Sequence, residues 1–561
     1  MPLSILIWLP VASALLAALW PSRLAPRVAF AGSLVTLGLA IGYVFGFDRG
    51  HGGLQFVTDR SWISQLGIHY KLGLDGLNLF LVLLTALIFC ASILWANLRE
   101  WERPRLFYFQ FGLAESAVLG AFLAQDLALF VVFFDLMLVP FYFLIGAWGS
   151  GDRVRATTKL VIYTLVGSLL MLVGAIATGV IAAQGGQPLS FAFSDLAQAH
   201  LAKGSQEWIF LCFAAAFLVK MPAFPLHGWM PDGYRSMPTP VVAVFSGVLS
   251  KVAAYGFLRV VLPIFPDASV HFQLLLMLIA LASILYGSVM AFTQTNTKLI
   301  LGYSSMAQLG FITLGIFSLR PEGAQGAILQ MFNHGLVVAP AFFIVALLAA
   351  RAGGSEDIRD MGGIAFRAPV LAGLFLIVAF ATLAMPGSAN FVGEFLILLG
   401  VFKAKLAIAA IAFTGVVLAA VYMLRAFIGS THNRVGEKAQ SREMSLADGV
   451  VIVPLVLVIL ALALYPQLPL GRSEPAVKAS IRAAGSIANP PPQPAAQTLP
   501  QGAVPPGGVP QGAVPQGAVP QGAVPQGAVP QGAVPQGAVP QGAVPQGAVP
   551  QGAAVPQGAQ Q

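Results

Sequence analysis

The sequence predicts an all-α, polytopic membrane protein of about fourteen transmembrane helices. Of its 561 residues, 57% are hydrophobic and only 9% are charged, whereas soluble proteins have about 25% charged residues. Apolar runs of the length that a helix needs to cross a bilayer recur through most of the chain. The ten-residue alternating segments of a transmembrane barrel are not seen. These observations exclude an aqueous globular enzyme.

Proline, glycine and charge clusters divide the apolar runs into spans. Lys and Arg are more frequent in the loops after odd-numbered spans, which predicts that those loops are cytoplasmic. Both termini are then extracytoplasmic, and the protein is a multi-pass protein of the cell inner (plasma) membrane. The predicted spans are 3–20, 28–47, 74–97, 106–124, 127–148, 158–183, 208–230, 240–262, 272–293, 298–318, 325–350, 369–400, 405–428 and 447–468.

The C-terminal segment differs in composition from the rest. No charged residue follows Arg482, and the pentad QGAVP repeats from Gln501 onwards. Frequent proline prevents a continuous helix, and the repeat has no large apolar side chain to bury. We therefore predict a transmembrane domain over 1–482 and a disordered low-complexity tail over 483–561. Binding of a partner by this tail is the alternative.

Several kinds of ligand are not expected. The net charge of +8 is scattered through short loops, and it forms no basic stripe for nucleic acid. The only two cysteines, Cys90 and Cys212, both lie inside apolar spans. Two cysteines do not supply the four ligands that an iron–sulfur cluster normally takes. The sequence thus predicts no metal site, no cofactor site and no redox centre in this chain.

Ionisable residues deep inside the spans are the candidate functional residues. Each costs at least about 2.5–3.5 kcal/mol at the bilayer centre and therefore indicates function. All of them exchange protons, which predicts a proton relay. The alternative is that Asp135 and Lys220 form a static ion pair that joins two helices. The relay candidates are Asp135, Lys220, Lys251, His334 and Glu394, with Glu115 and His227 as secondary candidates.

Two spans are interrupted by proline. Pro222 and Pro225 follow Lys220 closely, and Met385-Pro386-Gly387 precedes Glu394. Proline removes a helix hydrogen bond, which a membrane tolerates only where the backbone is buried or lines a wet cavity. Broken helices at matching positions indicate inverted repeats, here over about 106–262 and 272–428.

Long motifs around these residues resemble a known family. FDLMLVPFYFLIGAWG (134–149), VKMPAFPLHGWMPDG (219–233), LSKVAAYGFLR (249–259) and MPGSANFVGEF (385–395) are similar to the antiporter-like subunits of proton-translocating NADH–quinone oxidoreductase, respiratory complex I. Chain M of that complex is the most similar. The segments GLDGLNL (73–79) and 286–305 also resemble sequences of this family.

The resemblance implies fourteen helices with two inverted five-helix repeats. It pairs Asp135 with Lys220 and continues a proton path through Lys251, His334 and Glu394. The sequence departs from the family pattern twice. The family usually has glutamate at position 135, so the shorter aspartate makes direct contact with Lys220 less certain. Tyr234 replaces the histidine of the family's PDAH motif, and a tyrosine does not relay protons at neutral pH.

The expected function is that of a proton-translocating membrane subunit. Redox energy would come from partner membrane and peripheral subunits, which would hold the NADH, flavin, iron–sulfur and quinone sites. Two alternatives stay open. One is a subunit of a multi-subunit sodium/proton antiporter, and the other is a passive scaffold whose charges only lock helices together.

Overall fold

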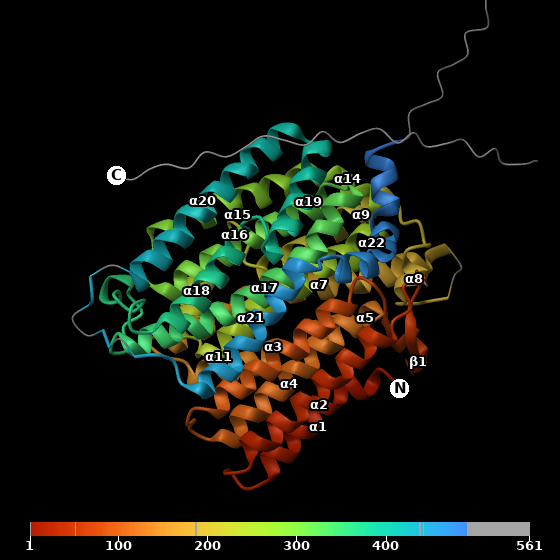
Figure 1. Ribbon diagram of the computed structural model, residues 1–561. Coiled ribbons are helices and arrows are strands. Elements are labelled where there is room, and N and C mark those ends of the chain that lie inside the picture. Colours follow the sequence, from red (N-terminus) through yellow and green to blue (C-terminus); the bar gives the residue numbers. More distant parts are fainter. Residues whose placement is uncertain are drawn as a thin grey trace, which may run out of the picture. The chain divides into compact units, whose positions relative to one another are not determined.

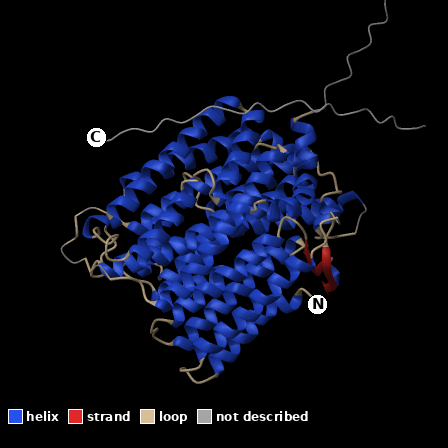
Figure 2. Cartoon of the chain, viewed as in Figure 1, coloured by secondary structure: helices blue, strands red, loops and turns tan. Residues whose placement is uncertain are grey.

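The computed structural model describes residues 2–50, 52–185, 188–432, 434–436, 439–440 and 442–490. Within these residues the protein is mostly helical, and its long helices lie side by side in a bundle (Figures 1 and 2). This confirms the predicted helical, polytopic class. Most of the predicted tail, including all the QGAVP pentads, lies outside the described residues.

The N-terminal half contains the described strands as well as helices. Its elements are α1 (Ser4–Leu19), α2 (Ala25–Gly46), β1 (Gln55–Ile63), η1 (Ser64–Leu66), β2 (Ile68–Leu74), α3 (Leu79–Asn97), α4 (Pro104–Leu123), α5 (Leu127–Leu136), α6 (Leu138–Trp148), α7 (Arg153–Ala182), η2 (Ala183–Gly185), α8 (Phe193–Leu196), α9 (Lys203–Lys220), α10 (Met230–Ser236), α11 (Thr239–Val244), η3 (Phe245–Leu249), α12 (Ser250–Gly256), η4 (Phe257–Val261) and α13 (Leu262–Ile264).

The C-terminal half is built almost entirely from long helices. Its elements are α14 (Pro266–His271), α15 (Gln273–Thr293), α16 (Thr297–Phe317), α17 (Pro321–Arg351), η5 (Ile358–Asp360), α18 (Pro369–Thr382), α19 (Ala389–Ala404), α20 (Leu406–Thr431), α21 (Leu446–Leu464) and α22 (Gln467–Ala488).

Most of the predicted spans correspond to helical segments that have the length and apolar composition needed to cross a membrane. Among the described residues, eleven helical segments are long and apolar enough to cross a membrane. Two of these combine consecutive elements, one α5 with α6 and the other all the elements from α11 to α13. The helices α1 and α18 are apolar but shorter, and α9, which carries Lys220, is not among the eleven.

A hairpin and a long C-terminal helix are among the elements that were not predicted from the sequence. The strands β1 and β2 form an antiparallel hairpin between α2 and α3. The loop that follows it is fixed by a buried ion pair, in which Arg259 Nη2 lies 2.6 Å from Asp75 Oδ1. The second element is α22, which packs on α17 through hydrogen bonds of 3.1 Å and 2.6 Å from Gln325 to Leu470 O and Ser473 Oγ. Since α22 ends at Ala488, helical structure continues past the predicted boundary at residue 482.

Helix α16 occupies the interior of the bundle. Every one of its residues is buried, and it packs against α15, α17, α19 and α20. It presents Ser304, Ser305 and Gln308 to its neighbours. A helix that is surrounded on all sides can contact groups on both halves of the protein at once, and this position brings the candidate site together.

Candidate functional site: a buried series of ionisable residues

Lys220 lies at the point where α9 ends. Pro222 removes a backbone donor and disfavours helical geometry at the preceding residue, so Met221 is extended at φ −95° and ψ 91°. The C-terminal position suits an ammonium group, because the free carbonyls there carry partial negative charge. The side chain is only 5% exposed. Its Nζ donates to Phe134 O at 3.1 Å and lies 4.3 Å from the centre of the Phe134 ring.

Asp135 lies beside Lys220 but does not touch it. The helix that carries it is interrupted at Met137 between α5 and α6, because Pro140 has no N–H to donate to the carbonyl of Leu136. The two charged groups interact electrostatically, yet no ion pair within 4.0 Å joins these two described residues. The Asp135 Oδ1 atom is buried and has no hydrogen-bond partner. Direct contact, which the shorter aspartate made uncertain, is thus absent in this conformation.

Lys251 is completely buried in α12. Its Nζ donates to Ser246 O and to Ser250 Oγ, the latter at 3.3 Å. Ser246 belongs to η3, a π-helical turn, and such turns occur frequently at functional sites. Ser246 Oγ also lies 3.1 Å from Ser305 Oγ of α16, so Ser246 contacts both Lys251 and the central helix, through its carbonyl and its hydroxyl respectively.

His334 faces the Lys251 region from α17. It is 2% exposed, its Nδ1 has no hydrogen-bond partner, and it interacts electrostatically with Lys251. The π-helical turn η3 and helix α17 approach each other closely at Gly247 of η3 and Gly335 of α17. A Cβ atom added to Gly335 would collide with the carbonyl oxygen of Gly247. Only glycine at this crossing permits the spacing that brings His334 and Lys251 together.

Substitution of Gly335 tests this crossing. We expect Gly335→Val to lower the yield of folded protein and to destabilise it by about 1–3 kcal/mol, as overpacking does. Thermal unfolding of the purified protein in detergent measures the effect. Gly38→Val in α2 is the matched control, because a Cβ at Gly38 meets no atom within 4 Å. Equal stability of the two variants would contradict the close approach.

Glu394 lies just after the second break. The gap between α18 and α19 contains Gly387, whose φ of +91° favours glycine. Glu394 is 3% exposed, and its Oε1 accepts a hydrogen bond of 2.7 Å from Gln308 Nε2 of α16. Gln330 of α17 joins the same cluster. Neither glutamine was predicted from the sequence, although an amide inside an apolar span is a detectable signal.

The secondary candidates lie outside this series. The His227 ring lies 4.8 Å from the Tyr286 ring, near the Lys159–Asp232 ion pair of 2.9 Å. Glu115 is buried in α4 beside Cys90, and no hydrogen bond or ion pair among the described residues joins it to Asp135 or Lys220. Tyr234, which replaces the family histidine, is buried near Ser246.

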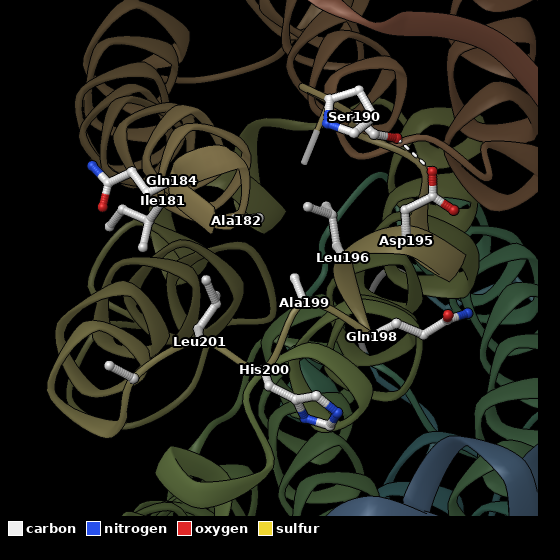
Figure 3. A pocket seen from close by; sticks show the side chains of 12 residues that line it. Ile181, Ala182, Gln184, Ser190, Asp195, Leu196, Gln198, Ala199, His200 and Leu201 are labelled. Carbon is white, nitrogen blue, oxygen red and sulfur yellow. Dashed lines mark hydrogen bonds between the residues drawn. The ribbon is translucent and has the colours of Figure 1, made fainter. Parts of the chain in front are cut away.

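One cavity lies away from these residues. It has a volume of about 700 Å³ and is lined by the end of α7 and the segment 188–202 (Figure 3). Hydrogen bonds from Ser190 at 2.7 Å and Ser194 at 2.9 Å lower the pKa of the Asp195 carboxyl at its edge. Among the described residues no three His, Cys, Asp or Glu side chains are grouped to hold a metal ion.

Comparison with known proteins identifies the relatives of this chain. The family model described as NADH:quinone oxidoreductase/Mrp antiporter, TM, matches residues 124–419. NADH-quinone oxidoreductase subunit M of Rhodobacter capsulatus is 35% identical over 83% of this chain and 93% of its own length. A chain of respiratory complex I from Thermus thermophilus with bound NADH is 31% identical, with a TM-score of 0.79 over 86% of this chain and 99% of that chain.

A chain of the Mrp complex from Dietzia sp. DQ12-45-1b shares the fold, with a TM-score of 0.74 and 23% identity over 86% of this chain and 98% of that one. At that identity the match shows the fold alone. The family match covers more than half of the chain, and the similarity to subunit M extends along nearly the whole length of the curated relative. The chain therefore belongs to the NADH:quinone oxidoreductase/Mrp antiporter transmembrane family.

Proposed function

We propose that this chain is the proton-translocating membrane subunit of an NADH–quinone oxidoreductase. The observation that carries the proposal is the series of buried ionisable groups on α9, α12, α17 and α19, together with the half-buried Asp135 on α5, in a chain similar to subunit M over nearly the whole length of that relative. Isolated ionisable groups are expensive inside a membrane, so a series of them needs a functional reason.

In this proposal Lys220 is loaded from the cytoplasm and passes its proton through Lys251 and His334 to Glu394. The end of α9 keeps the Lys220 ammonium next to Asp135 without an ion pair, so the attraction between them changes with small movements. Two unit charges attract by about 4 kcal/mol at about 4 Å and an effective dielectric of about 20. Moving one proton against about 180 mV costs about 4 kcal/mol. Since the pair is farther apart than 4.0 Å here, it reaches that full value only when the helix ends approach each other.

The finer architecture belongs to the same proposal. We infer fourteen membrane-spanning segments, with α9, α1 and the broken pair α18–α19 added to the eleven apolar segments. The proposal also includes two inverted repeats over about 106–262 and 272–428, and extracytoplasmic termini. It places the transmembrane domain over 1–482 and the tail over 483–561, with the last turns of α22 continuing into the tail to Ala488. Redox energy then arrives from partner subunits that hold the flavin, the iron–sulfur clusters and the sites for NADH and quinone.

Affinity purification of the tagged full-length chain from its native membrane tests this assignment. We expect flavin-containing and iron–sulfur subunits to co-purify, together with NADH oxidation that acidifies one side of a reconstituted vesicle. Glu394→Gln should leave the assembled subunits intact and reduce proton pumping to background. Normal pumping by an assembled Glu394→Gln complex would contradict the role of this acid.

The second candidate is a subunit of a sodium/proton antiporter, which the shared fold with the Mrp complex favours. The two candidates differ in their energy source. Sodium-driven proton exchange in vesicles without NADH, and purification without flavin or iron–sulfur subunits, would favour the antiporter.

A further inference from the structure

The carboxyl group of Glu394 is held on one side only. Its Oε1 accepts hydrogen bonds from Gln308 Nε2 at 2.7 Å and from Gln330 Nε2 at 3.5 Å. Its Oε2 is buried and has no hydrogen-bond partner among the described residues. The two oxygens of one carboxyl group thus have different surroundings.

The side-chain amides of Gln330 and Gln308 form a hydrogen-bonded chain to Glu394, in which each amide donates toward the acid. Gln330 Nε2 also donates to Gln308 Oε1 at 2.7 Å. An ionised carboxylate accepts hydrogen bonds but donates none, so Gln308 turns its NH₂ group toward Glu394 and its carbonyl toward Gln330. Reversing Gln308 would place its carbonyl against the carboxylate and its NH₂ against another NH₂. The charge of the acid therefore fixes the order Gln330, Gln308, Glu394.

A proton on Oε1 conflicts with this order, because Oε1 already receives the Gln308 N–H. A proton on Oε2 leaves both amides in place. We propose that Gln308 and Gln330 are positioning residues that keep Oε1 as an acceptor and make Oε2 the atom where Glu394 gains and loses the relayed proton. One O–H bond forms at Oε2 and the same bond later breaks, with no transfer of electrons. This inference rests on the proposed function.

The surroundings of the acid fit such a route. Gln330 lies one turn before His334 on α17, and Asn390 lies one turn before Glu394 on α19. His334 Nδ1 and both polar side-chain atoms of Asn390 are buried without partners. Asn333 Nδ2 donates to Ala389 O at 2.6 Å, which holds these two helix segments together. Buried unpaired polar atoms are rare in proteins, and several of those in the described part of the chain belong to the segments of α17 and α19 that carry His334 and Glu394.

The charged groups on the neighbouring helices have other partners. On α17, Glu322 and Arg351 lie at the two ends and His334 lies in the interior. Lys298 of α16 pairs with Glu356, and Arg425 of α20 donates to Gln294 O. Tyr422 of α20 interacts electrostatically with Glu394, and its hydroxyl lies 2.9 Å from Ser304 Oγ of α16. Among the described residues no cation hydrogen-bonds to Glu394, so the amide hydrogen bonds from Gln308 and Gln330 are the main stabilisation of the ionised acid.

Gln308→Met tests the proposal, because it preserves the length of the side chain but removes the donor. A carboxylate that loses a hydrogen-bond donor holds its proton more tightly. We expect the acid limb of the pH profile of NADH-driven pumping to move about one pH unit toward alkaline pH, which equals tenfold tighter proton binding. The measurement uses the assembled, purified complex in vesicles. Gln308→Glu, which donates again when protonated, should recover pumping at acidic pH.

Gln273→Met is the matched control, because Gln273 Nε2 donates to Phe317 O at 3.0 Å and does not touch Glu394. Its pH profile should equal that of the native complex. A native profile for Gln308→Met, or an equal loss of pumping at every pH, would overturn the positioning role. If Glu394→Gln itself pumps normally, the proposed function fails instead, so the two failures are distinguishable.

Discussion

Lys220→Ala should abolish NADH-driven proton pumping while the complex still assembles. The lysine ends a helix, donates to a backbone carbonyl and has no ion pair within 4.0 Å, so its removal leaves no carboxylate without a direct partner. The lost group is the proposed proton carrier. The measurement compares protons pumped per NADH oxidised in vesicles with the amount of assembled complex. A normal ratio in this variant would refute the relay.

Lys220→Arg separates charge from proton exchange. Arginine keeps the positive charge but does not release its proton at accessible pH, so pumping should fail here too. Lys298→Met is the matched control, because Lys298 is also a buried lysine and forms an ion pair of 2.7 Å with Glu356. This variant should lower stability but leave the pumping ratio of each surviving complex unchanged.

Asp135→Asn should also stop pumping without preventing assembly. Breaking a buried ion pair typically costs about 3–5 kcal/mol, but this acid forms no direct pair with Lys220. Asparagine preserves the shape and removes the attraction on which the proposed cycle depends. Asp135→Glu should keep most of the activity, since the charge remains and the longer side chain reaches closer to the lysine.

The two readouts of Asp135→Asn distinguish a relay from a static bridge. Pumping and assembly are measured on the same preparation. An assembled complex that does not pump fits the relay. Poor assembly with normal pumping per surviving complex would instead show that Asp135 only joins helices.

The sequence was sufficient for the helical class and for the ends of the broken helices. Apolar runs, and the prolines at positions 222, 225 and 386, act through local backbone chemistry, which a single sequence displays directly. The hairpin β1–β2 and helix α22 were missed because their stability depends on partners far along the chain. Arg259, which fixes the loop after the hairpin, is separated from Asp75 by most of the N-terminal half.

The charged residues of the site were predicted from the sequence, whereas its neutral residues were not, because the role of the neutral residues depends on packing between distant helices. Lys220 and Glu394 are conspicuous, because a charge inside an apolar run has a large cost. Gln308 and Gln330 are neutral, and their role follows only from the packing of α16 and α17 against α19. The gap between Asp135 and Lys220 likewise depends on how two helix ends pack, which spacing along the chain does not reveal.

The complete burial of α16 has a consequence for biogenesis. A helix with no face toward lipid in the finished protein still has to leave the ribosome and enter the bilayer, and α16 does so with Lys298 and Gln308 in its sequence. Alone in lipid these groups would be poorly solvated. Helix α15 precedes α16 immediately and packs along it, so the two are expected to insert as one hairpin. The remaining faces of α16 are then covered only after α17 and α20 have been inserted and have packed against it.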